Sequence, residues 1–129
     1  MERRMEILVI GGNRFMGKKV VETLYKEHNI TVLNRSGRSP VSALSCNIIR
    51  QNRNELKELK EYDIIIDMCL YNLEQTKNIV DILKKQQNLQ QYIFISSIAS
   101  ELEFFGEYGK QKQLAEKYIM YSDLPWTIL

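Results

Sequence analysis

The stretch that decides the fold is residues 7–17, ILVIGGNRFMG. An apolar run typical of a buried strand ends in Gly11 and Gly12, and a segment with helical periodicity begins at Gly17. Gly11 can take the sharp turn off the strand, Gly12 lets a ligand approach the backbone, and Gly17 lets the helix pack closely on the strand. Because the free N–H groups of a helix N-terminus bind anions, the pattern predicts a pyrophosphate site. The alternative is a glycine-rich turn of an ordinary α/β protein.

Apolar runs recur along the chain with helical segments between them, which is typical of a parallel sheet covered by helices. Strands are expected at 6–10, 30–34, 47–50, 62–68, 91–96 and 126–129. Helices are expected at 17–28, 73–86 and 108–121, with a short polar, solvated helix at 53–61. We interpret residues 1–129 as one α/β domain with a Rossmann-type, doubly wound parallel sheet that has helices on both faces and ends in its sixth strand.

Composition and charge exclude several classes of protein. The 129 residues are 44% hydrophobic and 26% charged, enough for one core without disulfides or metal. No apolar run approaches the roughly 20 residues of a membrane span, no signal peptide follows Met1, and the two cysteines have no CxxC spacing. A cytoplasmic location without a membrane partner is therefore expected. A net charge of +2 makes nucleic acid an improbable partner, and no metal site is predicted.

The sequence ends inside an expected strand, in the segment DLPWTIL at 123–129. Domains seldom end on their most apolar stretch. Three explanations stay open: a longer protein was cut there, the gene is naturally short, or a second copy covers this edge in a homodimer.

The residue that ends the second strand is the main sequence indicator of cofactor choice. A carboxylate there accepts a hydrogen bond from the ribose 2′-OH of NAD and repels the 2′-phosphate of NADP. That residue is Asn34, with Arg35 and Arg38 after it and Arg14 in the glycine turn. Three guanidinium groups could surround a 2′-phosphate, so NADP is favoured and NAD remains an alternative. Arg35 and Arg38 would otherwise be solvated loop charges.

A candidate catalytic group follows the fifth strand. Ser97 lies at the carboxyl edge of that strand, and Tyr108 and Lys112 stand four apart on the next helix. An ammonium beside the phenol would favour phenolate and make Tyr108 a general acid or base, while Ser97 could bond the reacting oxygen. The alternative is a packed ring beside a solvated charge.

In this order, the segments GGNRFMG, TVLNR, YDIIIDMC, YIFISS and YGKQK resemble the extended and atypical short-chain dehydrogenase/reductase superfamily, close to the NAD-dependent epimerase/dehydratase group. Arg14 replaces the usual middle glycine, as in the branch that includes chloroplast stem-loop-binding proteins. The resemblance implies that the loop cradles the pyrophosphate through Gly11, Gly12, Arg14, Phe15, Met16 and Gly17.

The same resemblance implies roles for the other strand ends. Asn34 and Arg35 would surround the adenosine ribose, and Asn52 stands where relatives place an acidic residue at the adenine. The cofactor crevice would be lined by Cys69, Leu70 and Tyr71. Ser97, Tyr108 and Lys112 would be catalytic, with Lys112 also holding the nicotinamide ribose.

Two functions therefore remain in competition. The first is an NADP-dependent oxidoreductase or epimerase-like enzyme that acts on a nucleotide sugar or a related small molecule, of which the chain holds the cofactor-binding part without the C-terminal substrate-binding region. The second is a catalytically incomplete NADP(H)-binding module that acts as a sensor or interaction protein. RNA binding, suggested only by the stem-loop-binding relatives, has little support from the charge.

Overall fold

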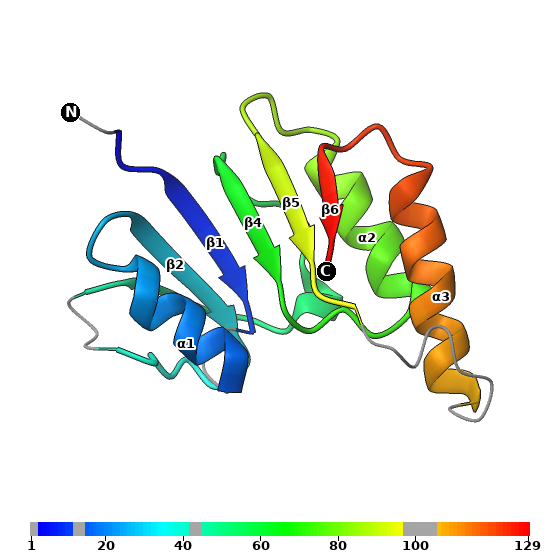
Figure 1. The fold of residues 1–129 in the computed structure, drawn as a ribbon, viewed down its shortest axis with the longest axis horizontal. Helices are drawn as coiled ribbons and strands as arrows, with labels where there is room; N and C mark the ends of the chain where they lie inside the picture. Colours follow the sequence, from blue (N-terminus) through cyan, green and yellow to red (C-terminus); the bar gives the residue numbers. More distant parts are fainter. Residues whose placement is uncertain (1–2, 12–14, 42–44, 97–105) are drawn as a thin grey trace.

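The structure, a computed structural model, describes residues 3–11, 15–41, 45–96 and 106–129. Its elements are β1 (Glu6–Ile10), α1 (Phe15–Leu24), β2 (Asn29–Asn34), β3 (Asn47–Arg50), η1 (Arg53–Glu55), β4 (Ile64–Asp67), α2 (Leu73–Leu83), β5 (Gln91–Phe94), α3 (Gly106–Met120) and β6 (Trp126–Ile128). The strands form one parallel sheet in the order β3-β2-β1-β4-β5-β6 (Figure 1). The predicted doubly wound α/β fold, with the sixth strand at its C-terminal end, is confirmed.

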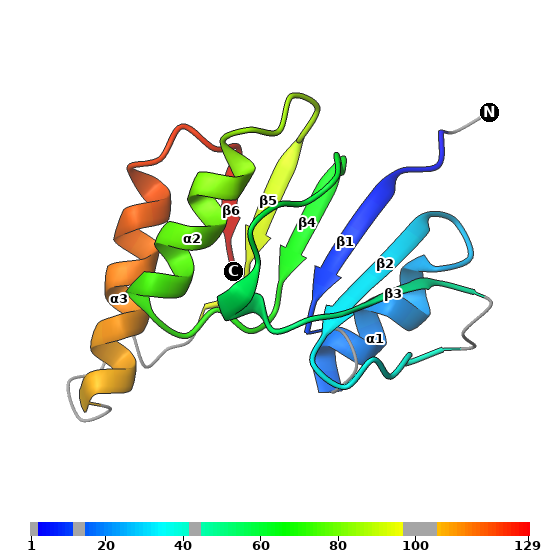
Figure 2. The same cartoon turned by 180° about the vertical axis from the view of Figure 1, so that it is seen from behind.

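Side chains alternate along each strand, so both faces of the sheet carry apolar residues. Helices cover both of these faces. On one face, Val9 and Val32 belong to the apolar cluster that Val21 of α1 completes. On the other face, Leu8 and Ile10 belong to the cluster that α2 and α3 cover. In Figure 1, α2 and α3 lie side by side behind the β4–β6 half of the sheet, and α1 lies across the β1–β2 half. Figure 2 shows the same arrangement from behind, with α2 and α3 in front. The central strands β1, β2 and β4 are therefore buried between two apolar layers, and the edge strands β3 and β6 are not.

The strand order reverses between β1 and β4, which lie side by side in the middle of the sheet. Ile10, the last residue of β1, is opposite Leu33 in β2 and Asp67 in β4. From this point the chain leaves β1 and β4 toward opposite faces of the sheet. A crevice that binds ligands forms at such a switch point, outside the carboxyl ends of the strands.

The segment predicted as a polar helix at 53–61 differs from the structure. Only Arg53–Glu55 forms a short 3-10 turn, and residues 56–63 have no regular secondary structure. Arg53, Leu56 and Tyr62 are buried, whereas most residues between them, such as Lys57 and Glu58, are exposed as predicted. The predicted helix was wrong because a regular helix would turn these three buried side chains to different sides.

The ends of the regular elements are otherwise close to those predicted. Helix α1 stops at Leu24, four residues earlier than expected, and Tyr25–His28 form turns that feed β2. None of the helices within the described ranges is long and apolar enough to cross a membrane.

Candidate functional site

A cleft of about 750 Å³ opens at the switch point, on the carboxyl edge of β1, β2 and β4. Its volume falls within the range of about 300–1,000 Å³ that is usual for small-molecule sites. The residues that line it come from the ends of five strands, the starts of two helices and the short turn η1: Ile10, Gly11, Met16, Gly17, Leu33, Asn34, Arg35, Ser36, Gln51, Arg53, Met68, Cys69, Tyr71, Gln75 and Ile95. The cleft therefore lies where the sequence predicts a nucleotide.

The glycine turn forms the first wall of the cleft. Gly11 has a φ of +84°, and its N–H donates to the Leu33 carbonyl oxygen at 2.9 Å. A Cβ at Gly11 would lie 3.0 Å from Cys69 Sγ, so the turn leaves no space for a side chain on that side. Met16 and Gly17, from the first turn of α1, line the same wall. The predicted residues Gly12 and Arg14 and the side chain of Phe15 lie outside the described part of the chain.

The loop after β2 forms the second wall and is organised by Asn34. The Asn34 Oδ1 atom accepts a hydrogen bond from Gly37 N–H at 2.7 Å, and Nδ2 donates to the Arg38 carbonyl oxygen at 2.9 Å. Asn34 and Arg35 both line the cleft. Arg38 is exposed and does not belong to the lining residues. The structure thus brings two of the predicted ribose-side residues together at the cleft.

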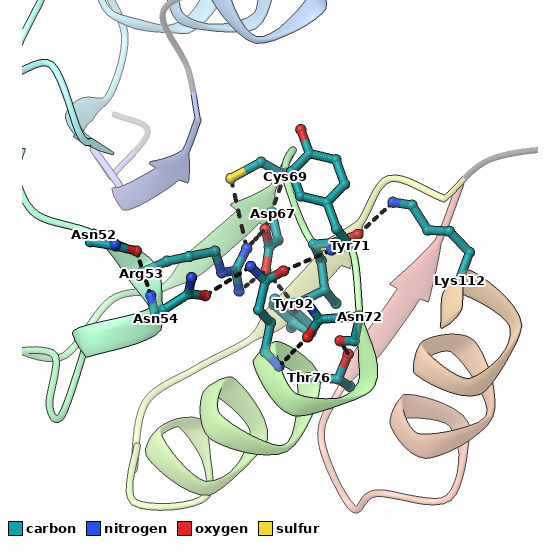
Figure 3. Close-up of polar contacts among 12 residues, drawn as sticks. Asn52, Arg53, Asn54, Asp67, Cys69, Tyr71, Asn72, Thr76, Tyr92 and Lys112 are labelled. Atoms are coloured by element: carbon teal, nitrogen blue, oxygen red, sulfur yellow. Dashed lines mark hydrogen bonds and ion pairs between the residues drawn. The ribbon is translucent and has the colours of Figure 1, made fainter. Parts of the chain in front are cut away.

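A buried ion pair forms the floor beneath this wall (Figure 3). Arg53 donates to both oxygens of Asp67, at 2.5 and 2.8 Å, and their side chains are 7% and 0% exposed. The Tyr92 hydroxyl donates to the same carboxylate at 2.7 Å, and the Cys69 N–H donates at 3.3 Å. Four donors therefore converge on one carboxylate.

The charges of this cluster set the titration of its members. Burial would lower the pKa of Arg53, but the Asp67 carboxylate outweighs burial and raises it, so the guanidinium stays protonated. Burial, reinforced by the negative charge of Asp67, raises the pKa of the Cys69 thiol and takes that of Tyr92 well above its usual value. Cys69 is therefore a neutral thiol near neutral pH, in contact with the cleft.

The loop between β4 and α2 is held by side chains from both sides. Gln75 Oε1 accepts from the Tyr71 N–H at 2.8 Å, and its Nε2 donates to Asn54 Oδ1 at 2.8 Å. From α3, Lys112 Nζ donates to the Leu70 carbonyl oxygen at 2.5 Å (Figure 3). The loop that lines the cleft through Cys69 and Tyr71 is thus tied to η1 and to α3.

Two of the three predicted catalytic residues, Tyr108 and Lys112, belong to the described part of the chain. Lys112 is 3% exposed, and its ammonium lies 5.4 and 5.0 Å from the ring centres of Tyr71 and Phe94. Burial lowers its pKa, with partial compensation from Asp67. Tyr108 is 45% exposed in the first turn of α3, and the hydrogen bond of Lys112 goes to Leu70 rather than to Tyr108. Ser97 lies outside the described residues.

Several lining residues were missed from the sequence. Ser36, Gln51, Arg53 and Gln75 line the cleft, whereas Asn52, the predicted residue, accepts a hydrogen bond from Asn54 N–H and is not among the lining residues. A usable signal existed for Gln51, because it follows the end of a strand as the predicted residues do. Within the described ranges, no group of three or more histidine, cysteine or carboxylate side chains could hold a metal ion.

The fold and the cleft define a Rossmann domain with its dinucleotide crevice. Residues 11–129 match the family described as NAD(P)H-binding, and the chain belongs to that family. A comparison with curated protein sequences finds no significant match.

Solved structures that share this fold include a 4-epimerase and a reductase. A UDP-N-acetylglucosamine 4-epimerase from Methanobrevibacter ruminantium has a TM-score of 0.79 and 19% identity over 98% of this chain and 54% of its own. Bordetella bronchiseptica WbmG in complex with NAD has a TM-score of 0.76 and 16% identity, with coverage of 98% and 52%. Vestitone reductase from alfalfa has a TM-score of 0.74 and 14% identity, with coverage of 97% and 56%. The chain spans about half the length of these proteins.

Proposed function

We propose that this chain is the NADP(H)-preferring domain of an epimerase-like or reductase-like enzyme that transfers hydride at a carbonyl or hydroxyl carbon of a nucleotide sugar or related small molecule. The observation that carries the proposal is the cleft at the β1/β4 switch point, with a glycine turn on one side and Asn34 and Arg35 on the other. Similar structures hold NAD or a UDP-sugar derivative, which supports the same class of ligand here.

The preference for NADP rests on the charge at the end of β2. An amide replaces the carboxylate that would repel a 2′-phosphate, and the Arg35 guanidinium is available for charge-assisted hydrogen bonds to it. Arg38 and Arg14 remain proposed members of the same anion site. Asn34 supports the site by holding the loop through Gly37 and Arg38.

Titration calorimetry with NADPH and NADH tests the preference. We expect NADPH to bind more tightly and Arg35→Ala to reduce the difference by about tenfold, since one hydrogen bond to a charged group contributes about 1.5–3 kcal/mol. Asn34→Asp keeps the acceptor for Gly37 but adds a negative charge, so it should favour NADH. Lys85→Ala removes an equal charge from the exposed end of α2, on the amino edge, and is the matched control. Equal affinities for the two nucleotides in the unaltered protein would refute the preference.

The proposed chemistry assigns proton transfer to Tyr108. When bound, the nicotinamide supplies or accepts the hydride. Tyr108 would give its phenolic proton to the carbonyl oxygen as the hydride reaches the carbon, Ser97 would hydrogen-bond that oxygen, and Lys112 would hold the ribose. Tyr108→Phe should abolish NADPH consumption with carbonyl substrates while leaving NADPH affinity within about twofold, because binding and proton transfer use different groups. Retained turnover would remove Tyr108 from this role.

One observation favours a second candidate, an NADP(H)-binding module without turnover. The Lys112 ammonium is bonded to Leu70 and is therefore engaged away from the Tyr108 phenol. Tight NADPH binding together with no consumption across nucleotide sugars, aldehydes and ketones would support this candidate over the enzyme.

A further inference from the structure

The Arg53–Asp67 pair stands out because it joins two distant parts of the chain inside the wall of the cleft. Arg53 belongs to η1, after β3, and Asp67 is the last residue of β4. The pair is almost inaccessible to solvent, yet Arg53 is one of the residues that line the cleft. Its atoms therefore lie just behind the ligand-facing surface.

A gain in fold stability does not by itself explain the buried Arg53–Asp67 pair. Removing two charges from water costs several kcal/mol per ion, and apolar replacements of buried pairs are often equally stable or more so. At this site the carboxylate also accepts from Tyr92 and from the Cys69 backbone, so the cluster fixes directions as well as charge. Because hydrogen bonds are directional, the bonds to the Asp67 carboxylate fix the relative positions of the residues that make them.

The geometry that they specify is the distance between β4 and the glycine turn. Asp67 is opposite Ile10, and the Met68 N–H donates to the Ile10 carbonyl oxygen at 3.0 Å. Cys69, bonded through its N–H to Asp67, places its sulfur against Gly11 and 3.8 Å from Arg53 Nη1. A shift of Asp67 would consequently move the side of the cleft that faces the turn.

We infer that Arg53 and Asp67 are positioning residues of the dinucleotide site, which hold the Cys69 side of the cleft at a fixed distance from the Gly11 turn. The inference rests on the proposed function, because it assigns these residues to the binding of the same ligand. The pair acts through Cys69 and Met68.

Variants that lack one charge of the pair, or both, separate its effect on NADPH binding from its effect on the stability of the fold. Arg53→Met and Asp67→Leu each leave a buried unpaired charge, and the midpoint of thermal unfolding should fall by roughly 10 °C or more. The double variant removes both charges and should recover part of that loss, because the Tyr92 hydroxyl and the Cys69 N–H still lack the Asp67 acceptor. The dissociation constant of the double variant for NADPH should nevertheless be at least about tenfold larger than that of the unaltered protein. The reason is that the Cys69 side of the cleft is no longer held at a fixed distance from the Gly11 turn.

A matched control exists at the other end of β4. Arg3 and Asp63 form an ion pair at 3.0 Å, and Asp63 also accepts from the Glu6 N–H. The Arg3→Met/Asp63→Leu variant should change thermal stability without weakening NADPH binding beyond about twofold. If it weakens binding as much as the Arg53/Asp67 double variant, or if that variant binds NADPH as the unaltered protein does, the inference is overturned.

A second measurement needs no ligand. Hydrogen exchange of the Gly11 and Met68 amides should be faster in the Arg53→Met/Asp67→Leu variant and unchanged in the control, because both amides bridge strands at the wall. If the unaltered protein binds neither NADPH nor NADH, the proposed function fails, and the exchange rates alone then decide the structural part of the inference. Unchanged exchange at both amides overturns it.

Discussion

Replacing Gly11 by alanine tests the idea that the glycine turn is closed against the loop after β4. Alanine must adopt the positive φ of +84°, which costs about 1–2 kcal/mol for an L-residue. Its Cβ must also fit 3.0 Å from Cys69 Sγ and 3.2 Å from Cys69 Cβ. The sulfur cannot move back freely because Arg53 lies behind it, so overpacking should add about 1–3 kcal/mol. We expect Gly11→Ala to lower the free energy of unfolding by about 2–5 kcal/mol.

Urea denaturation measures this loss, and two further variants divide it into its causes. Gly106 also has a positive φ, of +58°, but a Cβ at Gly106 would meet no atom of the described residues within 4 Å, so Gly106→Ala should show only the backbone cost of about 1–2 kcal/mol. Cys69→Ala in the Gly11→Ala background should restore the overpacking part, as a favourable coupling in a double-mutant cycle. Equal losses for the two glycine variants, together with no coupling to Cys69, would refute the reasoning.

Three more substitutions test the polar contacts beneath the cleft. Asp67→Asn leaves the Arg53 charge buried and unpaired, and the free energy of unfolding in urea should fall by about 3–5 kcal/mol. Tyr92→Phe removes one donor to the same carboxylate, so a smaller loss of about 1–3 kcal/mol is expected in the same assay. For Lys112, whose pKa is lowered from 10.5 in the folded state, the unfolded chain binds more protons between the folded pKa and 10.5. Stability should therefore rise with pH in that window relative to Lys112→Met, and parallel pH profiles would contradict this.

The sheet could be predicted because its signal is local. Each strand is a short apolar run, and the order of strand, glycine turn and helix in 7–17 places the switch point. Gly11 and Gly17, around the turn after β1, and Asn34 and Arg35, at the end of β2, were predicted from this local pattern and line the cleft. Met16 and Tyr71 were predicted only from the family resemblance and line it too. Cys69 was predicted from the family resemblance and also lines it.

The floor of the site could not be predicted because its partners are remote in sequence. Arg53 and Asp67 stand 14 positions apart, and the segment around Arg53 has the composition of a solvated helix. One signal was present: a carboxylate at the end of the apolar run Ile64–Asp67 needs a buried partner. Spacing predicted that Lys112 and Tyr108 share a helix face, but it could not predict that the Lys112 ammonium donates to the Leu70 carbonyl oxygen, because a long side chain has several acceptors within reach.

The ties from α3 to the loop after β4 limit how this region can change in evolution. Gln111 accepts from the Leu73 N–H, and Lys112, its neighbour, binds the Leu70 carbonyl oxygen. Two consecutive residues of α3 therefore form hydrogen bonds with both ends of the four-residue segment from Leu70 to Leu73. Insertion or deletion of a single residue within this segment would break at least one of the two hydrogen bonds. Related proteins that keep Gln111 and Lys112 should therefore keep the length of the segment, while the side chains within it vary.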